Sequence, residues 1–174
     1  MNVKRTVTVE SSPEELYNFW HNFENLPRFM QHLESVRVTG DGRSHWKAKA
    51  PLGQTVEWDA QVTEDEPNRL IGWHSLEGAD VQNSGTVRFT PATGGRGTVV
   101  QVEMQYDAPG GPLGVLLAKL FNEEPGQQVF EDLRAFKQVI ETGEVVRSDA
   151  TLSGTRLKQR PGQPPETWPL TESA

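Results

Sequence analysis

The sequence predicts one α+β domain in which an antiparallel sheet of seven strands packs against a long C-terminal helix. Three observations support this fold class. The chain opens with a strand that passes into a helix within two residues, roughly half the chain then alternates between apolar and polar residues, and a segment of helical periodicity follows. A length of 174 residues suits one domain with a sizeable core and is short for two.

The opening strand and helix are marked by specific residues. Val7 and Val9 alternate with polar neighbours, as in a strand with one buried face. Ser12 suits the N-cap of a helix, Pro13 suits its first position, and Glu15 stands where a capping box places an acid. The apolar residues that then fall on one helical face are Leu16, Phe19, Trp20 and Phe23.

The middle of the chain predicts the rest of the sheet. Glycine- and proline-containing turns separate stretches of alternation, which is typical of antiparallel strands. We expect residues 77–84 to form a polar connection, in which Asp80 and Asn83 suit contact with solvent as well as with the polar end of a ligand. The predicted strands after the first are residues 35–39, 45–50, 56–62, 70–76, 86–90 and 100–106.

The C-terminal part contains two apolar segments and a tail. Residues 113–121 are predicted to form a short helix, and a longer helix is predicted from about Asn122 to its stop at Gly143. Residues 147–174 contain several prolines and little periodicity, so the domain is predicted to span 1–146 and the tail to be disordered. The apolar stripe of the long helix consists of Val129, Leu133, Phe136 and Ile140.

Composition excludes several classes of function. The chain has no cysteine, which removes disulfides and thiolate chemistry and suits a reducing compartment, so we expect a cytoplasmic protein. Residues 1–5 lead straight into a strand, and we expect no cleavable signal. A net charge of -7 disfavours nucleic acid as a partner. No histidine pair has zinc-site spacing and the glycine-rich stretches lack a phosphate-binding pattern, so no metal or cofactor is expected.

The strand-to-helix opening at residues 7–20, followed by Phe-Glu-Asn-Leu-Pro-Arg-Phe-Met at 23–30, resembles the polyketide cyclase/dehydrase and lipid-transport superfamily, also called START-like or SRPBCC. It is most similar to the bacterial cyclase/dehydrase-like and coenzyme Q-binding-protein-like members. The resemblance covers most of the chain except the tail. It implies a helix-grip fold, like that of the birch pollen allergen, with a ligand pocket between a curved sheet and the C-terminal helix.

This resemblance turns the large inward-facing side chains into candidate ligand contacts. A lining of this kind suits a lipid, a quinone or an aromatic polyketide-like molecule, although the same residues also suit a solid core. The expected ligand-binding residues are Phe29, Met30, Trp46, Trp58, Trp73, Phe89, Met104, Tyr106, Leu133 and Phe136.

Two alternatives to simple binding remain open. A cyclase, aromatase or dehydratase needs an acid–base group, for which the candidates are His74, His45 and Tyr106. Alternation places both histidines on the outer face, however, and places no polar pair inside the pocket; His21 and His32 are predicted to be surface or capping groups. The second alternative is a protein-interaction domain that uses residues 113–121. The same apolar segment also suits a helix packed on the body, a lid over the pocket, a dimer contact or contact with a membrane surface.

Overall fold

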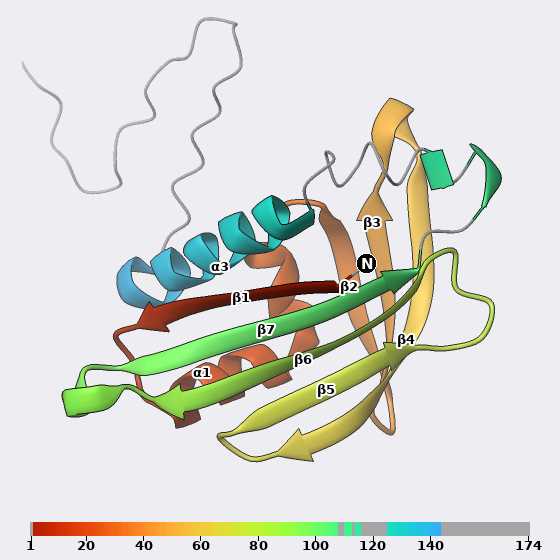
Figure 1. Ribbon diagram of the computed structural model, residues 1–174. Helices are drawn as coiled ribbons and strands as arrows, with labels where there is room; N and C mark the ends of the chain where they lie inside the picture. The colour runs from red at the N-terminus through yellow and green to blue at the C-terminus, as the bar shows by residue number, and fades with distance from the viewer. Residues whose placement is uncertain (1, 108–109, 113, 116–124, 144–174) are drawn as a thin grey trace, which may run out of the picture.

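The computed structural model describes residues 2–107, 110–112, 114–115 and 125–143, and it contains one antiparallel sheet of seven strands in the order β1-β7-β6-β5-β4-β3-β2 (Figure 1). This topology confirms the predicted α+β helix-grip fold. The strands are β1 (Asn2–Val9), β2 (Leu33–Gly40), β3 (Arg43–Lys49), β4 (Thr55–Glu66), β5 (Leu70–Ser75), β6 (Gln82–Pro91) and β7 (Thr98–Asp107).

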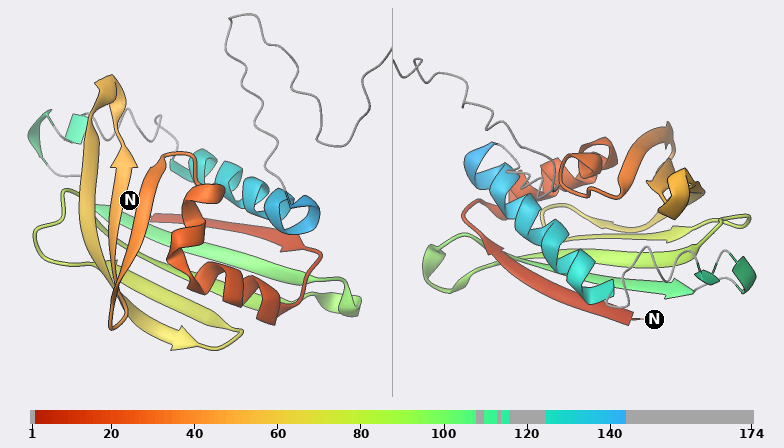
Figure 2. Two further views of the ribbon diagram at one scale, coloured as in Figure 1. Left: turned by 180° about the vertical axis from the view of Figure 1, so that it is seen from behind. Right: turned by 90° about the horizontal axis from the view of Figure 1, so that it is seen from above.

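The helices gather on one face of the sheet. Figure 2 shows that α3 and the α1 region both lie on the concave side, with α3 running along β1. The inner face of the sheet is therefore covered while the outer face is open to solvent, which explains the alternating burial along the strands. The helical elements are α1 (Pro13–His21), α3 (Pro125–Thr142) and the 3-10 turns η1 (Phe23–Arg28), η2 (Pro51–Gly53) and η3 (Thr93–Gly95).

Local sequence signals account for the helix ends. The Ser12 hydroxyl accepts a hydrogen bond from the Glu15 backbone N–H at 3.2 Å, and Pro13 opens α1 as predicted. The Glu15 carboxylate accepts from the Ser11 hydroxyl, so the cap is not a reciprocal capping box. At the other end of the chain, α3 stops at Gly143, whose φ of 77° suits glycine and whose N–H donates to the Val139 carbonyl.

The polar connection predicted at residues 77–84 is wrong in its second half, because β6 already begins at Gln82. Asn83 is buried on the inner face and pairs in register with Tyr106 of β7. Sequence reasoning assigned this stretch to a loop because its inward-facing residue is polar. An inward polar residue is consistent with a strand that lines a cavity rather than a solid core.

An aromatic cluster closes the interior between α1, η1 and α3. The Phe136 ring centroid lies 5.0 Å from that of Phe29 and 5.1 Å from that of Trp20, and Trp20 also approaches Phe89 edge-on at 6.4 Å. All four side chains are at most 2 % exposed. Such contacts add to the hydrophobic stabilisation by about 0.5–1.5 kcal/mol per pair.

Several predictions concern residues that the structure does not describe. The start proposed for the long helix near Asn122, most of the apolar segment 113–121 and the tail 147–174 lie outside the described residues. Within the described part of the chain, no helix is both long and apolar enough to cross a membrane.

Candidate ligand-binding cavity

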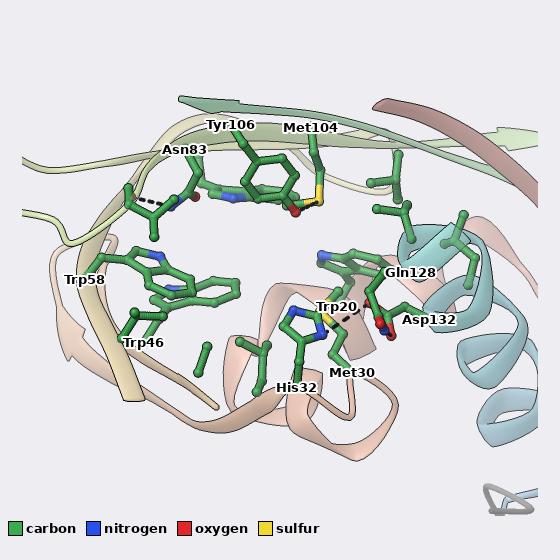
Figure 3. A pocket seen from close by; sticks show the side chains of 18 residues that line it. Trp20, Met30, His32, Trp46, Trp58, Asn83, Met104, Tyr106, Gln128 and Asp132 are labelled. Atoms are coloured by element: carbon green, nitrogen blue, oxygen red, sulfur yellow. Dashed lines mark hydrogen bonds and ion pairs between the residues drawn. The ribbon is translucent and has the colours of Figure 1, made fainter. Parts of the chain in front are cut away.

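A cavity lies between the N-terminal half of α3 and the inner face of the sheet (Figure 3). It offers about 50 Å³ to the centres of water-sized molecules, where a single water needs about 10–15 Å³. This volume counts only the positions that the centre of a water molecule can take, and a bound molecule occupies more space than its centre. The cavity therefore has room for several waters or one small aromatic ring. Its lining consists of Trp20, Met30, His32, Leu33, Trp46, Ala48, Val56, Trp58, Trp73, Val81, Asn83, Val102, Met104, Tyr106, Gln128, Val129, Asp132 and Leu133.

The structure divides the expected ligand-binding residues into two groups. Phe29, Phe89 and Phe136 do not line the cavity but belong to the closed aromatic cluster beside it. Periodicity shows which residues of a strand or helix face inward. It does not show which of these residues line a cavity and which are packed against other side chains. The seven that line the cavity are Met30, Trp46, Trp58, Trp73, Met104, Tyr106 and Leu133.

Tryptophans form one end of the cavity. Trp46 of β3 and Trp58 of β4 are direct partners in register and stack with ring centroids 5.8 Å apart and planes 23° apart. Trp73 of β5 contributes a third indole, which has room because its partner on β6 is Gly85. A Cβ atom at Gly85 would lie 2.4 Å from the Trp73 ring, so glycine is required there.

The other end is polar and contains an acid–base pair, in which Asp132 is buried and the side chain of His32 is 21% exposed. The Asp132 Oδ2 atom lies 3.7 Å from Nδ1 of His32, and its Oδ1 atom accepts a hydrogen bond from the Gln128 side chain at 2.9 Å. Burial raises the pKa of Asp132 to about 8 and lowers the pKa of His32 to about 4. Burial thus favours the uncharged form of both groups.

This pair corrects two predictions from the sequence. His32 is not a surface or capping group, and the pocket does contain a polar pair. His32 lies in the irregular backbone between η1 and β2, where alternation gives no guidance. Asp132, in contrast, carried a usable signal: it occupies the i+3 position from Val129 in the apolar stripe of α3, a place where a carboxyl group is unexpected.

Two further polar groups lie on the sheet side of the cavity. The Tyr106 hydroxyl donates to the Met104 sulfur at 3.1 Å, and burial, with a smaller effect of Asp132, raises the pKa of this phenol. The Asn83 side-chain amide donates to the Val81 carbonyl at 3.0 Å. Asp80 does not line the cavity and instead accepts from the Glu57 backbone N–H.

The histidine candidates for catalysis lie outside. His45 is on the outer face, with Nδ1 2.8 Å from Asp59 and Nε2 3.4 Å from Glu57, and the Asp59 hydrogen bond raises its pKa. His74 is exposed on the same face. Of the three acid–base candidates, only Tyr106 lines the cavity. Among the described residues, no group of three histidine or carboxylate side chains is arranged to hold a metal ion.

Comparison with known families identifies the fold. A family model described as polyketide cyclase/dehydrase and lipid transport matches residues 9–134, which include every residue that lines the cavity. The chain belongs to this family. Membership confirms the START-like, SRPBCC resemblance, and the family as a whole is associated with the binding or cyclisation of small hydrophobic molecules.

Individual relatives extend over nearly the same region. A crystal structure from Deinococcus radiodurans is 42% identical with a TM-score of 0.66, and the match covers 82% of this chain and 99% of that one. A 17.2 kDa protein of Streptomyces lincolnensis is 27% identical over 140 residues, 80% of this chain and 89% of the relative. A START superfamily protein from Mycobacterium smegmatis is 17% identical with a TM-score of 0.61 and shares the fold; the match covers 80% of this chain and 98% of that one.

Proposed function

We propose that this protein binds a small, mainly apolar molecule, of the lipid, quinone or aromatic polyketide class, in the cavity between its sheet and α3. The observation that carries the proposal is the cavity itself, with its three indoles at one end. The same interface is tightly packed at the aromatic cluster, so the hollow is local. Membership of a family that includes lipid transport proteins supports the same function.

The energetics permit binding without charged contacts. Burial of apolar surface contributes about 25 cal/mol per Å², so a ligand that loses about 300 Å² of exposed surface gains about 7 kcal/mol before the entropy cost of binding. Larger ligands require movement of the walls. Met30 and Met104 line the cavity, and methionine is the side chain that changes shape most readily at low cost.

Native mass spectrometry of detergent-free protein tests this proposal. We expect a stoichiometric small molecule that organic extraction releases, or uptake of one class from added lipids, quinones and aromatic polyketides. The variant Ala48→Leu places a larger side chain in the cavity wall and should reduce the bound fraction severalfold. Ala92→Leu, in the connection between β6 and β7, is the control and should bind as the wild type does.

Two results would count against binding. One is a protein that is empty as purified and takes up no member of the panel. The other is uptake that Ala48→Leu lowers no more than the control Ala92→Leu does. A ligand bound elsewhere on the molecule would not be affected by a change in the cavity wall.

A second candidate function, an enzyme of the cyclase or dehydratase type, is favoured by the His32–Asp132 pair. An uncharged imidazole can accept a proton from carbon next to a ligand carbonyl, while the protonated Asp132 gives its proton to the carbonyl oxygen; reversal of both transfers restores the pair. The sum is keto–enol exchange, the first step of many ring closures. Tyr106 lies on the same cavity as a further hydroxyl donor.

Deuterium exchange separates this enzyme from a passive binder. Acetophenone in heavy water should exchange its methyl protons faster with wild-type protein than with Asp132→Asn or His32→Asn, when compared at equal bound fraction. If acetophenone binds but its methyl protons exchange no faster than in buffer alone, the acid–base role of the pair is ruled out. The binding function would be unaffected by this result.

A further inference from the structure

Two buried indole N–H groups line the cavity without an acceptor. Trp20 is 1 % exposed, yet its Nε1 atom has no hydrogen-bond partner among the described residues, and the same is true of Nε1 in Trp58. More than about 90% of buried polar groups in proteins have a partner, and an unsatisfied one costs about 1–3 kcal/mol. Trp46 shows the ordinary situation, since its Nε1 donates to the Ser44 hydroxyl at 2.8 Å.

The two donors come from opposite walls. Trp20 belongs to α1 and Trp58 to β4, and Figure 3 shows the two indoles on different sides of the open space. The nitrogen of Trp20 is on the ring edge nearer to this space. Neighbouring atoms cover both nitrogens, so a ligand oxygen reaches one of these unused donors only after the adjacent side chains shift.

The uncharged state of the groups in the cavity wall favours an uncharged ligand. The titratable groups that face the cavity are His32 before β2, Asp132 on α3 and Tyr106 on β7, and burial favours the uncharged form of each. A charged ligand would lose its hydration without gaining a counter-ion, at a cost of several kcal/mol. The side-chain amides of Asn83 and Gln128 each donate one of their two N–H groups, to the Val81 carbonyl and to Asp132, so neither amide lacks a partner as the two indoles do.

We infer that the ligand is an uncharged, mainly apolar ketone, whose carbonyl oxygen accepts a hydrogen bond from the indole N–H of Trp20 or Trp58. This inference rests on the proposed binding function and narrows its ligand class. A carbonyl group supplies the missing acceptor without a charge, and its carbon skeleton contacts the apolar walls. A plain hydrocarbon would fill the cavity but leave both donors unsatisfied.

Acetophenone and ethylbenzene form the test pair, because they share one ring and differ mainly in a carbonyl at the position of a CH₂ group. Both are titrated into wild-type protein and into Trp20→Phe, Trp58→Phe and Trp46→Phe by calorimetry. We expect Trp20→Phe or Trp58→Phe to weaken acetophenone about fivefold more than ethylbenzene, as the loss of one neutral hydrogen bond predicts. Trp46→Phe is the matched control, since its N–H is already used, and should leave the ratio of the two affinities unchanged.

A measurement on the wild type makes the test independent of how the variants fold. The indole N–H resonance of Trp20 or Trp58 should move downfield on addition of acetophenone and not of ethylbenzene, while that of Trp46, which also lines the cavity, should respond equally to the two probes. Binding of both probes with no selective effect on either donor would overturn the ketone inference and leave the binding function intact. Failure of both probes to bind would instead count against binding in this cavity.

Discussion

The C-terminal half of α3 meets its surroundings as a solid core, whereas the N-terminal half of the same helix borders a cavity. Phe136 is fully buried and touches the rings of Trp20 and Phe29. Asp132, one turn earlier, and Val129, two turns earlier, line the cavity. One amphipathic helix thus packs in the core with its C-terminal half and lines a cavity with its N-terminal half. The difference arises because the inward side chain is a phenyl ring in the first case and a shorter group in the second.

The comparison shows how a domain can keep a hollow without losing its fold. The aromatic cluster joins α1, η1, β6 and α3 and supplies the packing that fixes the position of the helix. The cavity end can then carry an acid–base pair and unpaired indole donors, which would each destabilise an ordinary core. Stability and binding are concentrated in neighbouring but different parts of one interface.

The largest expected effect of a substitution is at the closed end. Phe136→Ala should lower the free energy of unfolding by about 3–5 kcal/mol, because it removes a fully buried ring and leaves a new void among three aromatic partners. Denaturant unfolding followed by circular dichroism measures the loss.

Two valines on one strand provide a matched control for this comparison. Val100 and Val102 both face inward on β7 at 0% and 2% exposure, but only Val102 lines the cavity. Val100→Ala should therefore cost about 1 kcal/mol more than Val102→Ala, since a residue beside a void has fewer neighbours to lose. Equal losses at the two positions would show that the two ends are packed alike.

The titration of Asp132 is expected to have a smaller effect on stability than Phe136→Ala. Its pKa rises from 3.8 in the unfolded chain to about 8 in the folded one, so its stabilising contribution is complete below about pH 4 and is lost as the pH rises through 8. His32, lowered from 6.5 to about 4, acts in the opposite sense up to pH 6.5. Between pH 6.5 and 8, wild-type protein should therefore lose about 2 kcal/mol relative to Asp132→Asn, at about 1.4 kcal/mol per pH unit.

The same unfolding curves, repeated at several pH values, check this slope. Glu131→Gln is the control, because Glu131 is exposed on the same helix and has only a minor effect on Asp132. It should keep most of the wild-type slope. Parallel stability profiles for wild type and Asp132→Asn would mean that this carboxyl titrates normally and that the cavity is wet.

The fold could be predicted from local sequence patterns, because strand alternation and helix capping depend on residues that are close together in the sequence. Period-two alternation identified the inner face of β7, and Ser12 with Pro13 located the start of α1. The error at β6 has the same origin: Asn83 is polar yet faces inward, so a rule that equates polar residues with solvent misassigned its strand. The curvature of the sheet came from the family resemblance, since no residue pattern reports it.

The candidate site was harder to predict from the sequence. A cavity exists where side chains that are distant in the sequence leave space between them, and local patterns do not report this. Alternation placed Met104 and Phe89 on the same inner face, but only the assembled structure shows that Phe89 meets Trp20 whereas Met104 borders empty space. His32 and Asp132 lie 100 positions apart on different elements, and their proximity is a property of the tertiary fold.

The placement of the tryptophans has an optical consequence. Four of the five in the chain, Trp20, Trp46, Trp58 and Trp73, line the cavity, and Trp168 lies in the tail. Nearly all of the intrinsic fluorescence of the domain therefore originates from the walls of this one compartment, and the stacked Trp46–Trp58 pair is close enough for its two transitions to couple. The protein carries its own unlabelled reporter of whether the compartment is full or empty.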